Sequence, residues 1–273
     1  MISVIVCSET GDSYHKKHVD ATIGVDHEYI MVDNTEDQFP SLCAAYNEGV
    51  SRAQGDICLF VHEDVFMIGE NWGYPIETLF EDETIGLVGV VGTQYLFGPE
   101  KATSYWWGLA GHPYLQGWVV MHRDNFPNFT DEQLPPGEFL LLRIWEKPAV
   151  VDVVAADGLF FAIRSELFDG VNTCLLPHRD PIRFDDKTFD GWHFYDLDIS
   201  MQVRQTHRLV VTPDVLTMHC SNPLTGDIWE DYGKRFVEKW KDQLPASSVG
   251  DITPPQAGNL HKVGLFSLPI KVM

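Results

Sequence analysis

Short runs of apolar, β-branched residues recur over the first third of the chain, and polar turns or amphipathic stretches separate them. The runs at residues 2–6, 29–32, 57–61 and 85–91 have the length and composition of strands. Residues 42–53 carry apolar side chains at helical spacing. Strands that alternate with helices predict an α/β fold with a mainly parallel, doubly wound sheet and helices on both faces.

Two of these predicted strands end abruptly in polar side chains. These are Asp33 and Asn34 after the second strand, and His62, Glu63 and Asp64 after the third. Ligands of parallel sheets bind outside the carboxyl ends of the strands. We therefore expect Asp33 and Asp64 to face one crevice.

Composition restricts the partners that the chain can bind. The 273 residues suffice for one large α/β domain or two small ones, and their net charge of −21 repels nucleic acid and anionic lipid. A bound cation can still reverse the local sign for a small phosphorylated ligand. The five cysteines show no metal-binding spacing, and Cys7 and Cys58 lie in apolar runs. Reduced thiols, no signal peptide and no membrane span predict a cytoplasmic protein.

The second half of the chain continues the pattern after an irregular, proline-rich stretch at 127–148. Its segments are predicted as strands at 150–155, 159–163 and 209–212, a polar turn entering a helix at 192–206, and a C-terminal helix at 228–244. The tail at 245–273 shows no clear period.

Acidic and imidazole side chains at four places in the chain can carry chemistry. The cluster at 62–64 suits a divalent cation, although a solvated strand end is the simpler interpretation. Asp196 and Asp198 open a predicted helix, where each could be a general base or only a helix cap. Asp157 also follows a buried strand. A lone histidine such as His219 is more often a packing residue than a metal ligand. His219 becomes a candidate ligand only in combination with these acidic residues.

Aromatic residues are concentrated in one segment. They are Tyr105, Trp106, Trp107, Tyr114 and Trp118, with Trp192 further along the chain. Aromatic faces bind the apolar faces of sugar rings, but they are also ordinary core residues. We expect at least one ring among Trp106, Trp107 and Trp192 to be exposed in the cleft.

In order and spacing, these motifs resemble those of the inverting GT-A glycosyltransferases of family 2, over roughly residues 1–225. The matching segments are residues 2–8, Val32-Asp33-Asn34, Tyr46-Asn47-Glu48-Gly49, residues 59–64, Asp157-Gly158 with residues 164–168, Tyr195-Asp196-Leu197-Asp198, and His219. His62 stands where the family has the first aspartate of its Asp-x-Asp metal motif. At this place the sequence resembles a subgroup of the family that has His-x-Asp, which leaves open whether His62 contacts metal, ribose or neither.

The resemblance implies a role for each matching residue. The donor, a nucleoside diphosphate sugar, would contact Ser8, Asp33, Asn34, Asn47, His62 and Glu63. Mn²⁺ or Mg²⁺ would be held by Asp64, His219 and His62, and a nitrogen ligand favours Mn²⁺. The acceptor, a carbohydrate, glycolipid or glycoprotein, would contact Asp157, Gly158, Trp106, Trp107, Trp192 and His193. Asp196, preferred over Asp198 and Asp157, would be the general base.

The same resemblance implies one catalytic domain at 1–225, with a nucleotide-sugar half at 1–100 and an acceptor half at 101–225. Residues 226–273 would add a helix and tail, and homo-oligomerisation is left open. Two other functions remain as alternatives. A nucleotidyltransferase normally needs a glycine-rich basic loop after the first strand, whereas residues 8–12 are acidic with one glycine. A non-catalytic carbohydrate- or nucleotide-binding protein would not turn over a sugar nucleotide.

Overall fold

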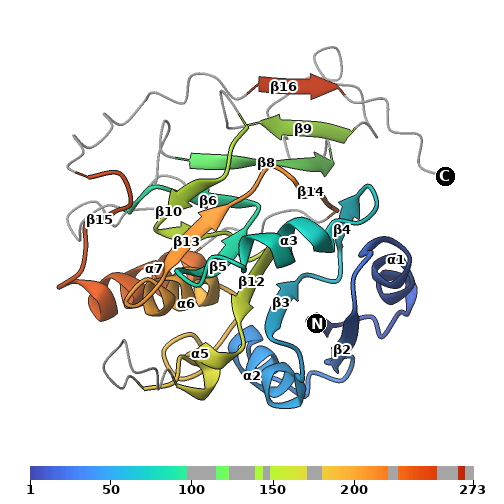
Figure 1. The fold of residues 1–273 in the computed structure, drawn as a ribbon. Coiled ribbons are helices and arrows are strands. Elements are labelled where there is room, and N and C mark those ends of the chain that lie inside the picture. The colour runs from blue at the N-terminus through green and yellow to red at the C-terminus, as the bar shows by residue number, and fades with distance from the viewer. Residues whose placement is uncertain are drawn as a thin grey trace, which may run out of the picture.

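The computed structural model describes residues 1–96, 115–122, 139–143, 148–170, 180–220, 227–250 and 264–267. Within these ranges the chain forms a large seven-stranded sheet, a second sheet beside it, and helices packed around them (Figure 1). The expected C-terminal helix is present as α7 (Asp227–Trp240).

The large sheet is mainly parallel, as predicted, with two strands that run in the opposite direction. In spatial order its strands are β10 (Val151–Val153), β13 (Arg208–Val211), β5 (Ile85–Gly89), β12 (Phe160–Arg164), β3 (Ile57–Val61), β1 (Ile2–Ser8) and β2 (His27–Asp33). Strands β1, β2, β3, β5 and β13 run in one direction, whereas β10 and β12 run in the other. The carboxyl ends of β2, β1 and β3 therefore meet at one edge.

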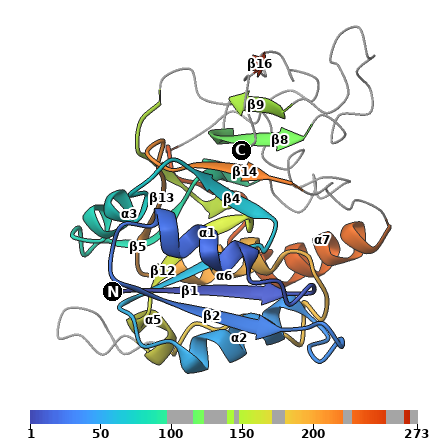
Figure 2. The same ribbon diagram turned by 90° about the vertical axis from the view of Figure 1, so that its right-hand side faces the viewer.

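The second sheet lies above the large one in both views (Figures 1 and 2). Its strands are β11 (Ala155–Ala156), β6 (Val91–Thr93), β8 (Leu115–His122), β14 (Leu216–His219) and β4 (Val65–Ile68), with β9 (Phe139–Arg143) on β8 and β16 (Gly264–Ser267) on β9. A separate pair joins β7 (Tyr95–Leu96) to β15 (Ala246–Ser247).

Helices cover both faces of the large sheet, and its inner strands β1, β3 and β5 are buried along their whole length. Ile2, Val4 and Val6 of β1 pack in one core with α1 (Tyr14–Thr22) and α3 (Gly73–Leu79). Ile5 and Cys7 pack in the opposite core. That core also contains α2 (Leu42–Arg52), α5 (Glu166–Asp169), α6 (Tyr195–Val203) and α7.

Helix α2 follows its sequence signals closely. Ser41 is its N-cap, and the Ser41 Oγ accepts a hydrogen bond from the Ala44 N–H at 3.1 Å. Gly49 faces β1, where an added Cβ would come within 2.3 Å of the Ile5 side chain. This glycine lets the helix pack close against the sheet.

Two predicted strands are divided in the structure. The run at 85–91 forms β5 and the start of β6, and the run at 150–155 forms β10 and the start of β11. At both places the chain passes from the large sheet to the second sheet, where β11 pairs with β6. Apolar composition does not reveal this passage, because the chain stays buried on both sides of it.

The cysteines and the helices bear on the expected environment of the protein. Cys7 and Cys58 are buried free thiols, as expected from their apolar runs. Among the residues that the structure describes, no helix has the length and apolar character needed to cross a bilayer. The cytoplasmic location and the division of the chain at residue 225 stay predictions.

Candidate active site

Three potential metal ligands converge where the two sheets meet. His62, Asp64 and His219 each offer one ligand atom, and these atoms all lie within 4.8 Å of one another. The Nε2 of His219 is 3.6 Å from the Oδ2 of Asp64. We call these three residues the metal group.

Strand pairing explains how His219 reaches Asp64. Residues 62–65 form a tight turn in which the Val65 N–H donates to the His62 carbonyl, so that β4 follows β3 directly. Strand β14 pairs antiparallel with β4, with His219 opposite Val65. The Cys220 N–H then donates to the Asp64 carbonyl at 3.0 Å. The register of a strand from late in the chain therefore completes the group.

The charges of the metal group suit a divalent cation. Burial and the neighbouring His219 together lower the pKa of His62 to about 4, whereas the charge of Asp64 opposes the shift. The His62 imidazole is therefore neutral near pH 7, which is the form that binds metal. Two imidazoles and one carboxylate form a donor set that first-row divalent metals accept.

Glu63 lies between His62 and Asp64 in the sequence but contacts the loop after β1 instead of joining the metal group. Its carboxylate accepts hydrogen bonds from the Ser8 Oγ at 2.6 Å, the Glu9 N–H at 3.0 Å and the Thr10 Oγ1 at 3.0 Å. Glu63 therefore holds the loop that follows β1 against the end of β3.

Asp33 and Asn34 lie at the same edge. Asp33 at the end of β2 lies opposite Ser8 at the end of β1. Its side chain is exposed, and its carboxylate accepts hydrogen bonds from the N–H and Oγ1 of Thr35. Asn34 is buried, and its Oδ1 accepts from the Phe39 N–H at 2.7 Å. Its Nδ2 has no hydrogen-bond partner among the described residues.

Asn47 has a structural set of contacts. Its Nδ2 donates to the Phe184 carbonyl at 2.8 Å, and its Oδ1 accepts from the Phe184 N–H at 3.2 Å. Both polar groups of the amide thus attach α2 to the segment around Phe184.

A pair of carboxyl groups lies beside the metal group. The Oδ2 of Asp196, in the first turn of α6, accepts from the Gly158 N–H at 2.9 Å, and its Oδ1 accepts from the Leu197 N–H. Burial, together with the negative charge of Asp157, raises the pKa of Asp196 to about 7, although the hydrogen bonds from these N–H groups oppose the increase. Burial also raises the pKa of Asp157, while the Leu159 N–H and His219 oppose the shift.

Asp198 has a different environment from Asp196. It is 1% exposed, and its carboxylate accepts from Lys239 Nζ at 2.7 Å, Trp240 Nε1 at 2.8 Å and Gln202 Nε2 at 2.8 Å. These partners leave Asp198 on the side of α6 that packs against α7. Its contacts support a structural role.

Tyr195 is a site residue that sequence analysis did not single out. Its hydroxyl lies 2.6 Å from the Nε2 of His62, so the residue before Asp196 touches the metal group. The only signal in the sequence was its position next to Asp196.

The aromatic and acceptor-side residues are only partly described. Trp192 is 39% exposed, and the half-buried His193 packs its ring 6.1 Å from that of Tyr232. Trp106 and Trp107 lie outside the described residues. The expectation of an aromatic ring in the cleft therefore stays a prediction.

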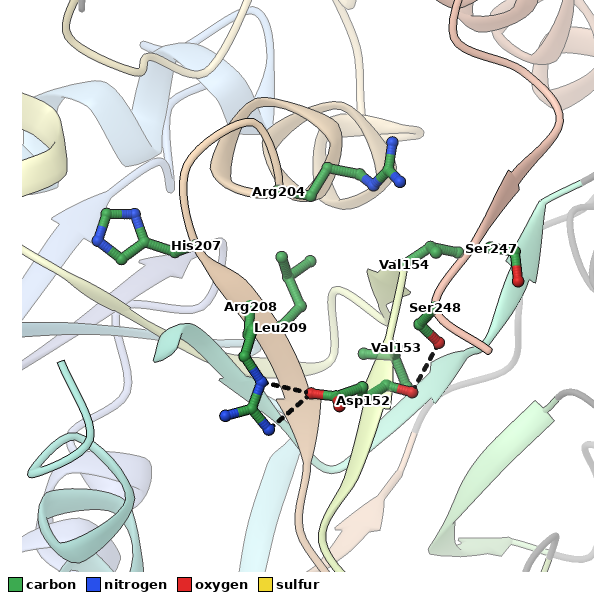
Figure 3. Close-up of a pocket in the computed structure, with 9 residues that line it drawn as sticks. All are labelled: Asp152, Val153, Val154, Arg204, His207, Arg208, Leu209, Ser247 and Ser248. Carbon is green, nitrogen blue, oxygen red and sulfur yellow. Dashed lines mark hydrogen bonds and ion pairs between the residues drawn. The ribbon is translucent and has the colours of Figure 1, made fainter. Parts of the chain in front are cut away.

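A pocket elsewhere in the fold is separate from these residues. Its lining includes Arg204 at the C-terminal end of α6, His207 and Arg208 at the start of β13, and Ser248, which follows β15 (Figure 3). Asp196 lies in the first turn of the same helix. The pocket is thus at the opposite end of α6 from the carboxyl pair.

Comparison with known proteins identifies the family. A family model described as a glycosyltransferase-like family matches residues 3–240, and the chain therefore belongs to that family. None of the curated proteins compared with the chain matches it.

Solved structures show a similar fold at low sequence identity. GalNAc-T7 with UDP, GalNAc and Mn²⁺ is 14% identical with a TM-score of 0.50, over 82% of this chain and 43% of that one. The mannosyltransferase PcManGT from Pyrobaculum calidifontis with GDP-Man and Mn²⁺ is 13% identical with a TM-score of 0.44, over 80% and 56%. S. aureus TarS 1–349 with UDP-GlcNAc is 12% identical with a TM-score of 0.43, over 83% and 59%.

The chain thus spans less than two thirds of each of these three proteins. The family match and the mixed α/β sheet establish the expected GT-A fold.

Proposed function

We propose that this protein transfers a sugar from a nucleoside diphosphate sugar to an acceptor hydroxyl, with inversion at the anomeric carbon. One observation carries the proposal. His62, Asp64 and His219 offer ligand atoms within 4.8 Å of one another, and they lie beside the buried Asp196 carboxyl, whose pKa is raised to about 7. The family supplies the glycosyl transfer, and this arrangement supplies a metal site and a base for it.

Asp196 is the proposed base. As the acceptor oxygen bonds to the anomeric carbon, the bond from that carbon to the diphosphate breaks, and the acceptor proton passes to the Asp196 carboxylate. A carboxyl with a pKa near the working pH is suited to this transfer. The two backbone N–H groups that bind Asp196 hold its oxygens in position.

His62, Asp64 and His219 are the proposed metal ligands. A divalent cation bound there would supply Lewis-acid stabilisation of the charge on the departing diphosphate. Their two nitrogen donors favour Mn²⁺ over Mg²⁺, whose sites are mostly all-oxygen. The Mn²⁺ and UDP bound in GalNAc-T7, which has a similar fold, support this choice.

The donor and acceptor sides follow from position. Ser8, Asp33, Asn34 and Glu63 lie at the edge where the first three strands end, which makes them the proposed nucleotide-side residues. We leave Asn47 out, because both of its polar groups bind Phe184. Asp157, Gly158, Trp192 and His193 lie on the proposed acceptor side, and Trp106 and Trp107 are retained from the family resemblance.

The proposed function can be tested by measuring the turnover of a panel of nucleoside diphosphate sugars with and without Mn²⁺. We expect Mn²⁺-dependent hydrolysis of at least one donor, because water can replace the acceptor. Asp64→Ala should abolish Mn²⁺-dependent donor binding, whereas Asp242→Ala, at an exposed position in the turn after α7, should not. Equal binding by wild type and Asp64→Ala would contradict the metal assignment. Donor binding without any turnover would instead support a non-catalytic binding protein.

A further inference from the structure

Tyr195 is buried next to the metal group. Its side chain is 5% exposed, and its hydroxyl lies 2.6 Å from His62 Nε2. The Tyr195 ring packs edge-on against Tyr46 at a centroid distance of 5.7 Å. A buried hydroxyl at this distance forms a strong hydrogen bond, so it restricts both the position and the protonation of the His62 ring.

The backbone on both sides is built to admit this tyrosine. A Cβ added at Gly158 would lie 2.1 Å from the Tyr195 hydroxyl oxygen, so a larger residue would displace it. Phe194, the N-cap of α6, has a left-handed φ of 65°, which is uncommon for a bulky residue. Its ring packs on Trp229 and Phe236 at 4.8 and 5.7 Å, which holds this conformation and directs Tyr195 inward.

The hydrogen bond can have two polarities, and they have opposite consequences for metal binding. If the Tyr195 hydroxyl donates to Nε2, the remaining proton of the neutral ring sits on Nδ1, and neither nitrogen is free for a metal. If Nε2–H donates to the Tyr195 oxygen, Nδ1 keeps its lone pair. Metal-binding histidines usually donate their other N–H to a nearby acceptor, which fixes the tautomer and the ring orientation.

We propose that Tyr195 is a positioning residue that accepts the Nε2–H of His62 and thereby presents His62 Nδ1 to the metal. This inference rests on the proposed metal site. It also answers the question that the sequence left open, because it makes His62 a metal ligand held from behind rather than a ribose contact. The residue next to the proposed base thereby links α6 to the metal group.

Tyr195→Phe tests the proposal, because it removes the hydroxyl and keeps the ring. Titration of the protein with Mn²⁺ alone, followed by the EPR signal of the free ion, should show affinity reduced by about 10–100-fold. Tyr46→Phe is the matched control. Tyr46 is a fully buried tyrosine packed on Tyr195, and its hydroxyl has no partner among the described residues. The Mn²⁺ affinity of Tyr46→Phe should stay within about twofold of wild type, against the loss of about 10–100-fold expected for Tyr195→Phe.

A double-mutant cycle tests whether the effect of Tyr195→Phe on Mn²⁺ affinity depends on His62 or reflects a general loss of structure. His62→Ala should weaken Mn²⁺ binding, and adding Tyr195→Phe should produce no further loss. Unchanged affinity in Tyr195→Phe would overturn the proposal, and tighter binding would show that the hydroxyl competes with metal for His62. An equal loss from Tyr195→Phe with and without His62 would also overturn it. If wild type binds no Mn²⁺, the metal assignment itself fails.

Discussion

At the scale of single residues, the environment of each carboxyl group separates its role from that of its neighbours. Asp196 and Asp198 lie in the same helix turn. The Asp198 carboxylate is paired with Lys239, whereas among the described residues Asp196 accepts from the backbone N–H groups of Gly158 and Leu197 and lies near the like charge of Asp157. A carboxylate that is already ion-paired is a poor proton acceptor. The contacts therefore favour Asp196 as the base.

The first prediction concerns the removal of this base. Asp196→Asn should lower kcat by about 10²–10⁴-fold, because an amide cannot accept the acceptor proton. Donor affinity in the presence of Mn²⁺ should remain close to that of wild type. Steady-state transfer and calorimetric donor titration measure the two quantities. Wild-type turnover by Asp196→Asn, together with an inactive Asp157→Asn, would move the base to Asp157.

The second prediction concerns pH. The base is active when deprotonated, and burial raises the pKa of Asp196 to about 7, so kcat/KM should rise with pH and level off above about 7. Asp157→Asn removes the negative charge that adds to this shift, so the acidic limb should move to lower pH. A pH–rate profile of both proteins measures the displacement. An acidic limb at the same pH in both would show that the two carboxyls do not interact.

At the scale of elements, α7 is attached to α6 through one buried carboxylate. Lys239 and Trp240 of α7 both donate to Asp198 of α6, and Lys239 also donates to Asp185 at 2.7 Å. The burial of Asp198 raises its pKa, and the ammonium of Lys239 opposes the shift. This network fixes the helix that begins with the proposed base.

The third prediction follows from this network. Lys239→Met leaves Asp198 buried without its cation, which should lower the free energy of unfolding by about 3 kcal/mol. Lys241→Met is the matched control, because Lys241 pairs with Glu238 on the exposed surface and such pairs contribute about 0–1 kcal/mol. Urea denaturation of the three proteins measures the difference. Equal stability of both variants would mean that the Asp198–Lys239 pair does not hold α7.

At the scale of the whole molecule, the metal group joins two sheets. His62 and Asp64 follow β3 of the large sheet, whereas His219 ends β14 of the second sheet. A bound ion would therefore cross-link parts of the fold that are otherwise held by packing and by the pairing of short strands.

The fourth prediction is a metal-dependent gain in stability. Mn²⁺ at 100 times its Kd should stabilise the protein by about 2.7 kcal/mol and raise Tm by several degrees, because it binds the folded state only. The Asp64→Ala variant should show no increase in Tm when Mn²⁺ is added. His27→Ala, at the opposite end of β2, should keep it. Differential scanning calorimetry measures the three proteins, and an equal rise in all of them would indicate Mn²⁺ binding at other places.

Elements with strong local signals could be predicted from the sequence. Apolar runs placed β1 and β3 because a strand buried on both faces needs continuous apolar residues, and the polar residues after β2 and β3 marked the edge where the proposed nucleotide-side residues lie. Helix α1 and strand β4 were missed. Only His15 and Val19 of α1 are buried, so its apolar period is too weak to detect.

Contacts between distant segments could not be predicted from the sequence. The register of β14 on β4 brings His219 to Asp64, the packing of α7 on α6 assigns Lys239 to Asp198, and the space left by Gly158 admits Tyr195 to His62. The turn at 62–65 also sends Glu63 to the first loop rather than to the metal group. Residue patterns encode burial along one segment, whereas these contacts depend on register and direction between segments, which arise only when the chain is packed.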